Sequence, residues 1–367
     1  MIKIIPEHRY FLALSFIKNL GDSRIHFLVK MFGSAQAVWE NCSSNFNPPK
    51  GINAQIINEI GKTQYLDLAD KEIEFCEKHR ISIVTYNQPN YPSLLKQCPD
   101  APMILFYKGD LNFESNLNIA IVGTRKITNY GKQFIHDIIE GLQHQNVNII
   151  SGLAYGCDIY AHQKALEFNL PTWAVLAHHL NHIYPAQHKK IAEEMLINGG
   201  WISEQSSTKG IQPSYFLQRN RIIAGLTKAT IVVESASHGG SLVTAKIAND
   251  YNRDVFALPG RNNDGMSQGC NHLIKTNQAY LIENFNDLVY HLNLDETKKT
   301  KQLDLFYTLT PEQEEIVNYL KQNGKTHIDN LALGLNKFSY QLMPTLLDLE
   351  LNQIVFPLPG KYFDLSP

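Results

Sequence analysis

The 367-residue sequence contains no apolar run that approaches the roughly 20 residues needed to cross a bilayer. Its first residues, MIKIIPEHRYF, place Glu7 and His8 where a secretory signal needs an uninterrupted apolar segment. We therefore expect a cytoplasmic protein without a membrane segment. An excess of basic charge is also missing, because 33 Lys and Arg stand against 35 Asp and Glu. Any binding of nucleic acid must then depend on a local basic site.

Paired cysteines are missing too. The five cysteines are scattered and form no CxxC pair, which argues against a zinc ribbon or a disulfide framework and suits a reducing cytosol. The cluster HHLNH at 178–182, with His188 nearby, lacks the Asp, Glu or Cys that would complete a ligand set, so we expect no metal. Neither GxGxxG nor the P-loop pattern occurs, so we expect no nucleotide cofactor.

What remains is a folded protein with 44% hydrophobic residues and enough length for two or three domains. Residues 10–40 carry apolar residues at helical spacing on both sides of a glycine turn, which fits a helix-hairpin-helix or any other helical hairpin. We expect a small helical domain over 1–80. The polar stretch 293–303 predicts a linker. Helical segments followed by a hairpin predict a winged helix over 304–367.

This C-terminal region has four Lys against eight Asp and Glu, which favours contact with a protein over contact with phosphates. Between the two flanking regions, short runs rich in Val and Ile alternate with helical segments. We expect strands at 81–86, 102–109, 118–123, 146–152, 172–177, 229–234 and 254–260, and helices at 130–144, 156–168, 186–198 and 240–251. This alternation predicts an α/β domain over 81–292, with a doubly wound, extended Rossmann-like parallel sheet buried on both faces.

Several strands of this central domain end in glycine or a small polar residue. The carboxyl ends of parallel strands meet at one edge, where ligands bind, and glycine allows a ligand to approach the backbone. A helix N-terminus at the same edge favours an anion. The residues that would form this anion site are Gly123, Thr124, Arg125, Ser151, Gly152, Gly240, Ser241, Leu242 and Thr244.

The segment FLQRNR at 216–221 is a second basic feature. Phe216 precedes Arg219, Asn220 and Arg221, and arginines beside aromatic rings suit single-stranded nucleic acid. The alternative is that either arginine forms a structural salt bridge. Cys157 has no evident base partner, and the carboxylates of Asp158, Glu204 and Glu234 have no evident acid or base partner, so we expect no enzyme.

Seven motifs, in order along residues 85–290, together resemble the DNA-processing protein A (DprA/Smf) family. They are IAIVGTRKITNYGK, IISGLAYGCDIYAHQKAL, YPAQH, ISEQ, FLQRNRIIAGLTKATIVVE, GGSLVTAKIANDYNRDVFALPG and QGCNHLIKTNQA. The sequence departs from the family pattern at His179-Leu180-Asn181, where Gly-Leu-Asp is common, and this puts the shape of the local loop in question.

The resemblance implies a dimeric protein that binds single-stranded DNA during natural transformation and loads the RecA recombinase onto it. Arg125 would then contact backbone phosphate, and the 219–221 and 240–242 segments would line the same groove. The resemblance also implies a SAM-like N-terminal domain. An alternative is an enzyme similar to nucleoside-monophosphate phosphoribohydrolases, but Ala245-Lys246 stand where its catalytic Glu is sought. A pure interaction scaffold would leave Arg125 unexplained.

Overall fold

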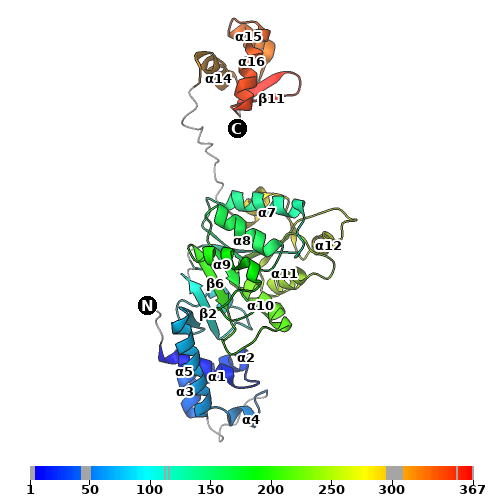
Figure 1. Ribbon diagram of the computed structural model, residues 1–367. Helices are drawn as coiled ribbons and strands as arrows, with labels where there is room; N and C mark the ends of the chain where they lie inside the picture. Colours follow the sequence, from blue (N-terminus) through cyan, green and yellow to red (C-terminus); the bar gives the residue numbers. More distant parts are fainter. Residues whose placement is uncertain are drawn as a thin grey trace. The chain divides into compact units, whose positions relative to one another are not determined.

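A computed structural model of the chain describes residues 5–42, 51–110, 113–114, 116–294, 309–352 and 354–365. The chain divides into two compact units, Met1–Glu296 and Thr297–Pro367. In the described ranges, no helix combines the length and the apolar character that a membrane span requires. The first unit contains a helical N-terminal part and a nine-stranded sheet, as Figure 1 shows.

The N-terminal part consists of α1 (Pro6–Phe16), α2 (Asp22–Phe32), α3 (Ala35–Asn41), α4 (Ala54–Ile57) and α5 (Thr63–Lys78). Phe11, Leu14 and Leu28 are buried in one apolar cluster that also includes Phe106 and Trp201 of the sheet. Since the helices and the sheet share this cluster, the predicted domain boundary near residue 80 lies inside the first compact unit.

The central sheet has the strand order β1-β2-β6-β5-β4-β3-β7-β8-β9. The strands are β1 (Ser82–Thr85), β2 (Ile104–Gly109), β3 (Leu117–Val122), β4 (Val147–Ser151), β5 (Thr172–Val175), β6 (Gly199–Ser203), β7 (Ala229–Val232), β8 (Asp254–Ala257) and β9 (Tyr280–Leu281). Across the sheet, in the order β6-β5-β4-β3-β7-β8-β9, every pair of neighbouring strands is parallel. The predicted α/β class with a mostly parallel sheet is therefore confirmed.

Helices cover both faces of this sheet. On one face lie α7 (Asn129–Leu142), α8 (Cys157–Glu167), the single-turn 3-10 helix η1 (Ala186–His188), α9 (Lys189–Met195) and α13 (Phe285–Leu292). On the other lie α6 (Ser93–Lys96), α10 (Pro213–Leu226), α11 (Gly240–Asp250) and α12 (Gln268–Lys275). Strand β3 is buried on both sides, because Ile119 and Ile121 face the first layer and Ala120 and Val122 face the second.

Two features of the sheet differ from the sequence-based expectation. The first two strands are not parallel to the rest: β1 pairs antiparallel with β2, and β2 pairs antiparallel with β6. The two-residue strand β9 was not predicted, and neither was β6, with sequence GGWIS. Strand β6 contains two glycines and so does not form a Val- and Ile-rich run. Its pairing with β2 nevertheless requires glycine, because a Cβ on Gly200 would lie 1.9 Å from the Lys108 carbonyl oxygen.

The second unit contains α14 (Pro311–Asn323), β10 (Thr326–His327), α15 (Ile328–Gly334), α16 (Ser339–Leu351), β11 (Val355–Leu358) and β12 (Tyr362–Leu365). Its three strands form an antiparallel sheet in the order β10-β12-β11. Ile316, Leu331, Leu346 and Phe363 belong to its own buried core. Most of the predicted linker 293–303 lies outside the described residues.

Candidate functional site

A cavity of about 270 Å³ opens at the carboxyl ends of β3 and β7, two neighbouring parallel strands of the sheet. Most residues of the predicted anion site line it, namely Gly123, Thr124, Arg125, Gly240, Ser241 and Thr244, and so do Arg219 and Asn220 of the FLQRNR segment. Residues from the turn after β3, from α10 and from the start of α11 thus meet at the edge where an open parallel sheet binds ligands.

Hydrogen bonds to Glu234, which follows β7, hold the turn after β3 in place. The side chain of Glu234 is buried and accepts hydrogen bonds from the Thr128 backbone N–H, at 2.9 Å, and from the Thr128 hydroxyl. The Thr124 backbone N–H donates to the Glu234 carbonyl oxygen at 2.7 Å. These bonds fix the segment 124–128 and occupy the start of α7, so α7 does not offer a free N-terminus to a ligand.

Glycines allow the loops around the cavity to approach one another. A Cβ on Gly123 would lie 2.4 Å from the Cys157 sulfur, and one on Gly152 would lie 2.4 Å from an Arg219 guanidinium nitrogen. Gly156 has a φ of +79°, and its Cβ would meet the Thr124 carbonyl oxygen at 2.2 Å. Any side chain at these positions would displace the loops that shape the cavity.

Arg219 forms the floor of the cavity together with Asp158. Its guanidinium donates to the carbonyl oxygens of Gly152, at 2.5 Å, and Val175. Burial lowers the pKa of Arg219 to about 10, although Asp158 opposes this effect and Arg125 adds to it. The same burial raises the pKa of Asp158, and Arg219 opposes that rise. Arg219 is 6% exposed, and its Nε has no hydrogen-bond partner in the described residues.

Arg125 is the exposed cation at the rim of the cavity. In the described part of the chain it makes no hydrogen bond and no ion pair. Helix α11 begins at Gly240, and nothing lies within 4 Å of where a Gly240 Cβ would be, so its N-terminus is open. An unpaired guanidinium, a buried guanidinium with a spare N–H and an open helix N-terminus together suit an anion.

The other predicted site residues do not line this cavity. Ser151 is fully buried and donates its hydroxyl to the Ile121 carbonyl oxygen, which ties β4 to β3. Gly152 lies behind the guanidinium of Arg219, and Leu242 packs on the core beneath α11. Phe216 lies one turn before Arg219 on α10, and its ring contacts Tyr184.

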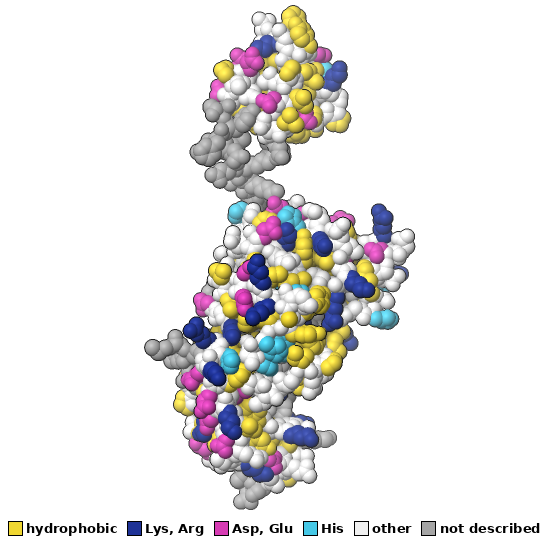
Figure 2. Space-filling model, in the orientation of Figure 1, with side chains coloured by type: hydrophobic (Ala, Val, Ile, Leu, Met, Phe, Trp, Pro, Cys, Tyr) yellow, Lys and Arg dark blue, Asp and Glu magenta, His cyan; other side chains and the backbone are white. Residues whose placement is uncertain are grey.

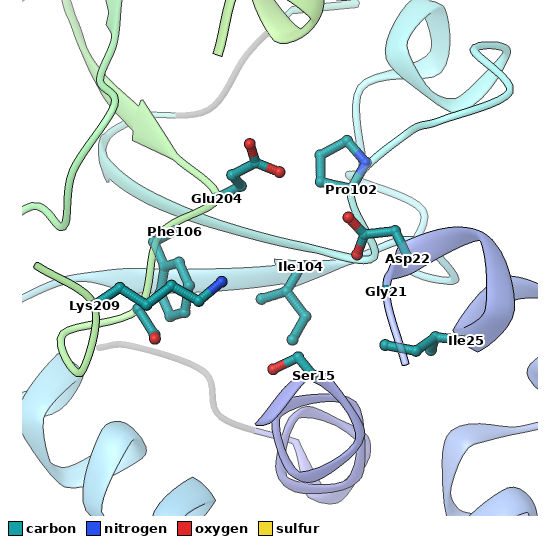
Figure 3. Close-up of a pocket in the computed structure, with 10 residues that line it drawn as sticks. Ser15, Gly21, Asp22, Ile25, Pro102, Ile104, Phe106, Glu204 and Lys209 are labelled. Atoms are coloured by element: carbon teal, nitrogen blue, oxygen red, sulfur yellow. The ribbon is translucent and has the colours of Figure 1, made fainter. Parts of the chain in front are cut away.

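Arg221 points away from the cavity toward the N-terminal helices. It forms an ion pair with Glu204 and approaches the Asp22 carboxylate to 3.6 Å. Asp22 and Glu204 line a second cavity of about 110 Å³, which Figure 3 shows between α1, α2 and the sheet. The arrangement of Arg221 is the structural salt bridge that the sequence left as an alternative for either arginine.

Sequence reasoning did not identify some residues that shape the cavity. Asp158 was noted only as a carboxylate without a partner, whereas in the structure it lines the cavity with Arg219, whose charge opposes the rise in its pKa. Ser235, whose hydroxyl accepts a hydrogen bond from the Ser241 hydroxyl at 2.9 Å, and Met266 also line the cavity. The signal for Asp158 was its position in the first turn of a helix that follows a strand and a glycine loop.

Together, the sheet and the cavity define an α/β protein with an anion site at the carboxyl edge of its parallel strands. Comparison with known families identifies it more closely. The chain belongs to the DNA recombination-mediator protein A family, whose model matches residues 82–293. This finding confirms the resemblance seen in the sequence motifs.

Curated relatives agree with this assignment. The chain is 32% identical over 331 residues to protein Smf of Escherichia coli K12, which covers 86% of this chain and 88% of that protein. It is 38% identical over 199 residues to DNA processing protein DprA of Streptococcus pneumoniae, which covers 54% and 70%.

Two solved structures are similar as well. The X-ray structure of DNA processing protein A from Streptococcus pneumoniae has a TM-score of 0.65 at 29% identity, covering 79% of this chain and 98% of that chain. A structure of DNA processing protein A from Helicobacter pylori, reported for its single-stranded DNA binding mode, has a TM-score of 0.53 at 30% identity. It covers 58% of this chain and 96% of that chain.

Proposed function

We propose that this protein binds single-stranded DNA at the β3–β7 cavity. The observation that carries the proposal is the exposed guanidinium of Arg125 at the rim, in the same cavity lining as the buried Arg219 and the N-terminus of α11. These groups match a phosphodiester, which is a singly charged anion with several acceptor oxygens. The likeness to a relative reported for its single-stranded DNA binding mode supports this choice of anion.

We further propose that the bound strand is passed to RecA during natural transformation, in the cytoplasm and by a homodimer, as the family membership suggests. The protein then acts as a carrier and not as an enzyme. One feature supports this view: the carboxylate of Glu234 accepts two hydrogen bonds from Thr128 and so serves to hold the turn after β3.

For the second unit we propose the winged-helix class. Its elements follow the order α14, β10, α15, α16, β11, β12, with the last two strands forming a hairpin. The helix before this hairpin, α16, exposes Tyr340, Met343, Leu347 and Leu351, and the acidic balance of 304–367 disfavours phosphate. We therefore assign this unit to protein contacts.

The test is fluorescence anisotropy with a labelled oligo-dT and the matched duplex over a series of salt concentrations. We expect tighter binding of the single strand. The logarithm of affinity should fall with the logarithm of salt concentration by about 0.7 for each phosphate neutralised. A folded protein that binds neither DNA would contradict the proposal and would make nucleoside monophosphates the next ligands to test.

A further inference from the structure

Two exposed tyrosines, Tyr155 and Tyr184, lie next to the cavity and do not take part in the phosphate site proposed above. Tyr155 follows Ala154, which lines the cavity, and 45% of its surface is exposed. Tyr184 precedes Pro185 in the loop after β5 and is 50% exposed. Both residues flank the same single-turn helix, η1, so their rings belong to one part of the surface.

Each ring is held in place from one side. The Tyr155 ring makes an edge contact with His188, with centroids 4.8 Å apart, and its hydroxyl donates to the Gln187 side chain at 2.9 Å. The Tyr184 ring makes an edge contact with Phe216 at 5.9 Å. Both residues are about half exposed, so each ring is held by a neighbour and is still available to a flat partner.

The two tyrosines follow strands that end at the same carboxyl edge of the sheet as the cavity. The cavity lies over the ends of β3 and β7, Tyr155 follows β4, and Tyr184 follows β5. These strands are consecutive in the sheet, in the order β5-β4-β3-β7. Figure 2 shows hydrophobic side chains gathered over α10, with Lys and Arg side chains beside them.

We propose that Tyr155 and Tyr184 form a platform on which nucleobases stack, next to the phosphate cavity. This inference rests on the proposed function, because a strand held at Arg125 would cross the two rings as it runs along the sheet edge. Aromatic rings serve such a role without reading sequence, since every base has a flat π face. The platform would select single strands, because the bases of a duplex are already stacked on each other.

The experiment compares a labelled oligo-dT with an abasic oligonucleotide of equal length, which keeps the phosphates and lacks the bases. Wild type should bind oligo-dT more tightly by about 5- to 150-fold for each stacked base. The Tyr155→Ala/Tyr184→Ala double variant should lose that margin on oligo-dT and keep its affinity for the abasic strand. Its salt dependence should stay that of wild type, because no phosphate contact is removed.

Two controls make the result specific. The Tyr155→Phe/Tyr184→Phe variant keeps both rings and should bind oligo-dT as wild type does. Tyr290→Ala, at an exposed tyrosine of α13 in the first unit, should change nothing.

The inference fails if the alanine variant binds oligo-dT as tightly as wild type, or if it loses affinity equally for both oligonucleotides. The first result would leave the tyrosines as a surface for a protein partner. If wild type binds neither oligonucleotide, the proposed function fails and the platform fails with it.

Discussion

At the scale of single residues, three arginines at the proposed DNA site and its border have different roles. Arg125 is exposed and unpaired in the described residues, Arg219 is buried and bonded to backbone carbonyl oxygens, and Arg221 is paired with Glu204. The sequence places Arg219 and Arg221 in one RNR motif and cannot tell which face of α10 each occupies. Residues that are two positions apart on an α-helix are rotated by about 200° around its axis. The side chains of Arg219 and Arg221 therefore leave α10 on opposite sides.

Arg125→Ala should weaken binding of oligo-dT and leave the fold intact. One phosphate contact is lost, so the slope of log affinity against log salt should become shallower by about 0.7. Stability should change by less than about 0.5 kcal/mol, because the side chain is exposed and makes no bond in the described structure. Lys71→Ala, which removes an exposed cation on α5, is the matched control for lost charge. Unchanged binding in a salt titration would show that Arg125 does not contact the strand.

Arg221→Ala should lower the stability of the fold and leave the affinity for oligo-dT unchanged. It leaves the carboxylates of Asp22 and Glu204 in a buried region without their cation, and burial already raises the pKa of both groups. Removing one partner of such a buried pair costs about 3–5 kcal/mol, which chemical denaturation can measure. Affinity for oligo-dT should be kept under conditions where the variant is folded. A stable variant that binds poorly would instead place Arg221 among the DNA contacts.

At the scale of elements, Glu234 connects β7 to the start of α7. It accepts two hydrogen bonds from Thr128, whose hydroxyl caps the helix by accepting from the Gly131 N–H at 3.3 Å. Glu234→Gln replaces one acceptor oxygen by an amide donor and should destabilise the protein by about 1–2 kcal/mol. Glu193→Gln, in an exposed pair with Lys189 at 3.8 Å, should cost less than about 0.5 kcal/mol. Equal melting temperatures for the two variants would contradict this role of Glu234.

The sequence predicted the parallel part of the sheet well and the antiparallel part poorly. Strands such as β3 are uninterrupted apolar runs next to amphipathic helices, so their pattern alone indicates burial on both faces. Strand β2 is an apolar run of the same kind, and nothing local reveals its direction. Strand β6 depends on a close approach to Lys108 that only glycine permits, and this is a tertiary constraint.

The candidate site was predicted in outline for a similar reason. Glycine turns at strand ends mark the carboxyl edge, so the residues around Arg125 and Ser241 could be placed together before the structure was known. The hydrogen bonds of Arg219 to the Gly152 and Val175 carbonyl oxygens join α10 to the ends of β4 and β5, and the contact of Tyr184 with Phe216 joins the loop after β5 to α10. Such pairs are set by how the helices pack, which spacing along the chain does not encode.

At the scale of the whole molecule, buried histidines should make stability depend on pH. His162 is fully buried beside Arg219 and His188, and burial lowers its pKa to about 3. In the unfolded chain the pKa is about 6.5, so between these values only the unfolded state takes up the proton. This contribution to stability is complete above pH 6.5 and falls as the pH decreases, by on the order of 2 kcal/mol at pH 5.

Buried carboxyl groups act in the opposite direction, because burial raises the pKa of Asp158 and Glu204. The effect of His162 is therefore measured as a difference between variants. The free energy of unfolding of His162→Gln should approach or exceed that of wild type as the pH falls from 7.5 to 5. His144→Gln, at an exposed position, is the control. A His162→Gln difference that is the same at both pH values would exclude this histidine as a source of acid sensitivity.

The division of the chain into two units gives the last prediction. Deletion of 304–367 removes most of the second unit, whose core is its own and whose balance is four Lys against eight Asp and Glu. All groups assigned here to phosphates and bases lie between Arg125 and Ser241, in the first unit. The truncated protein should therefore bind oligo-dT with the salt dependence of the full chain, and light scattering should report its oligomeric state in the same samples. A large loss of affinity in a truncated dimer would make the second unit a DNA contact. The same loss in a monomer would make this unit a requirement for dimerisation.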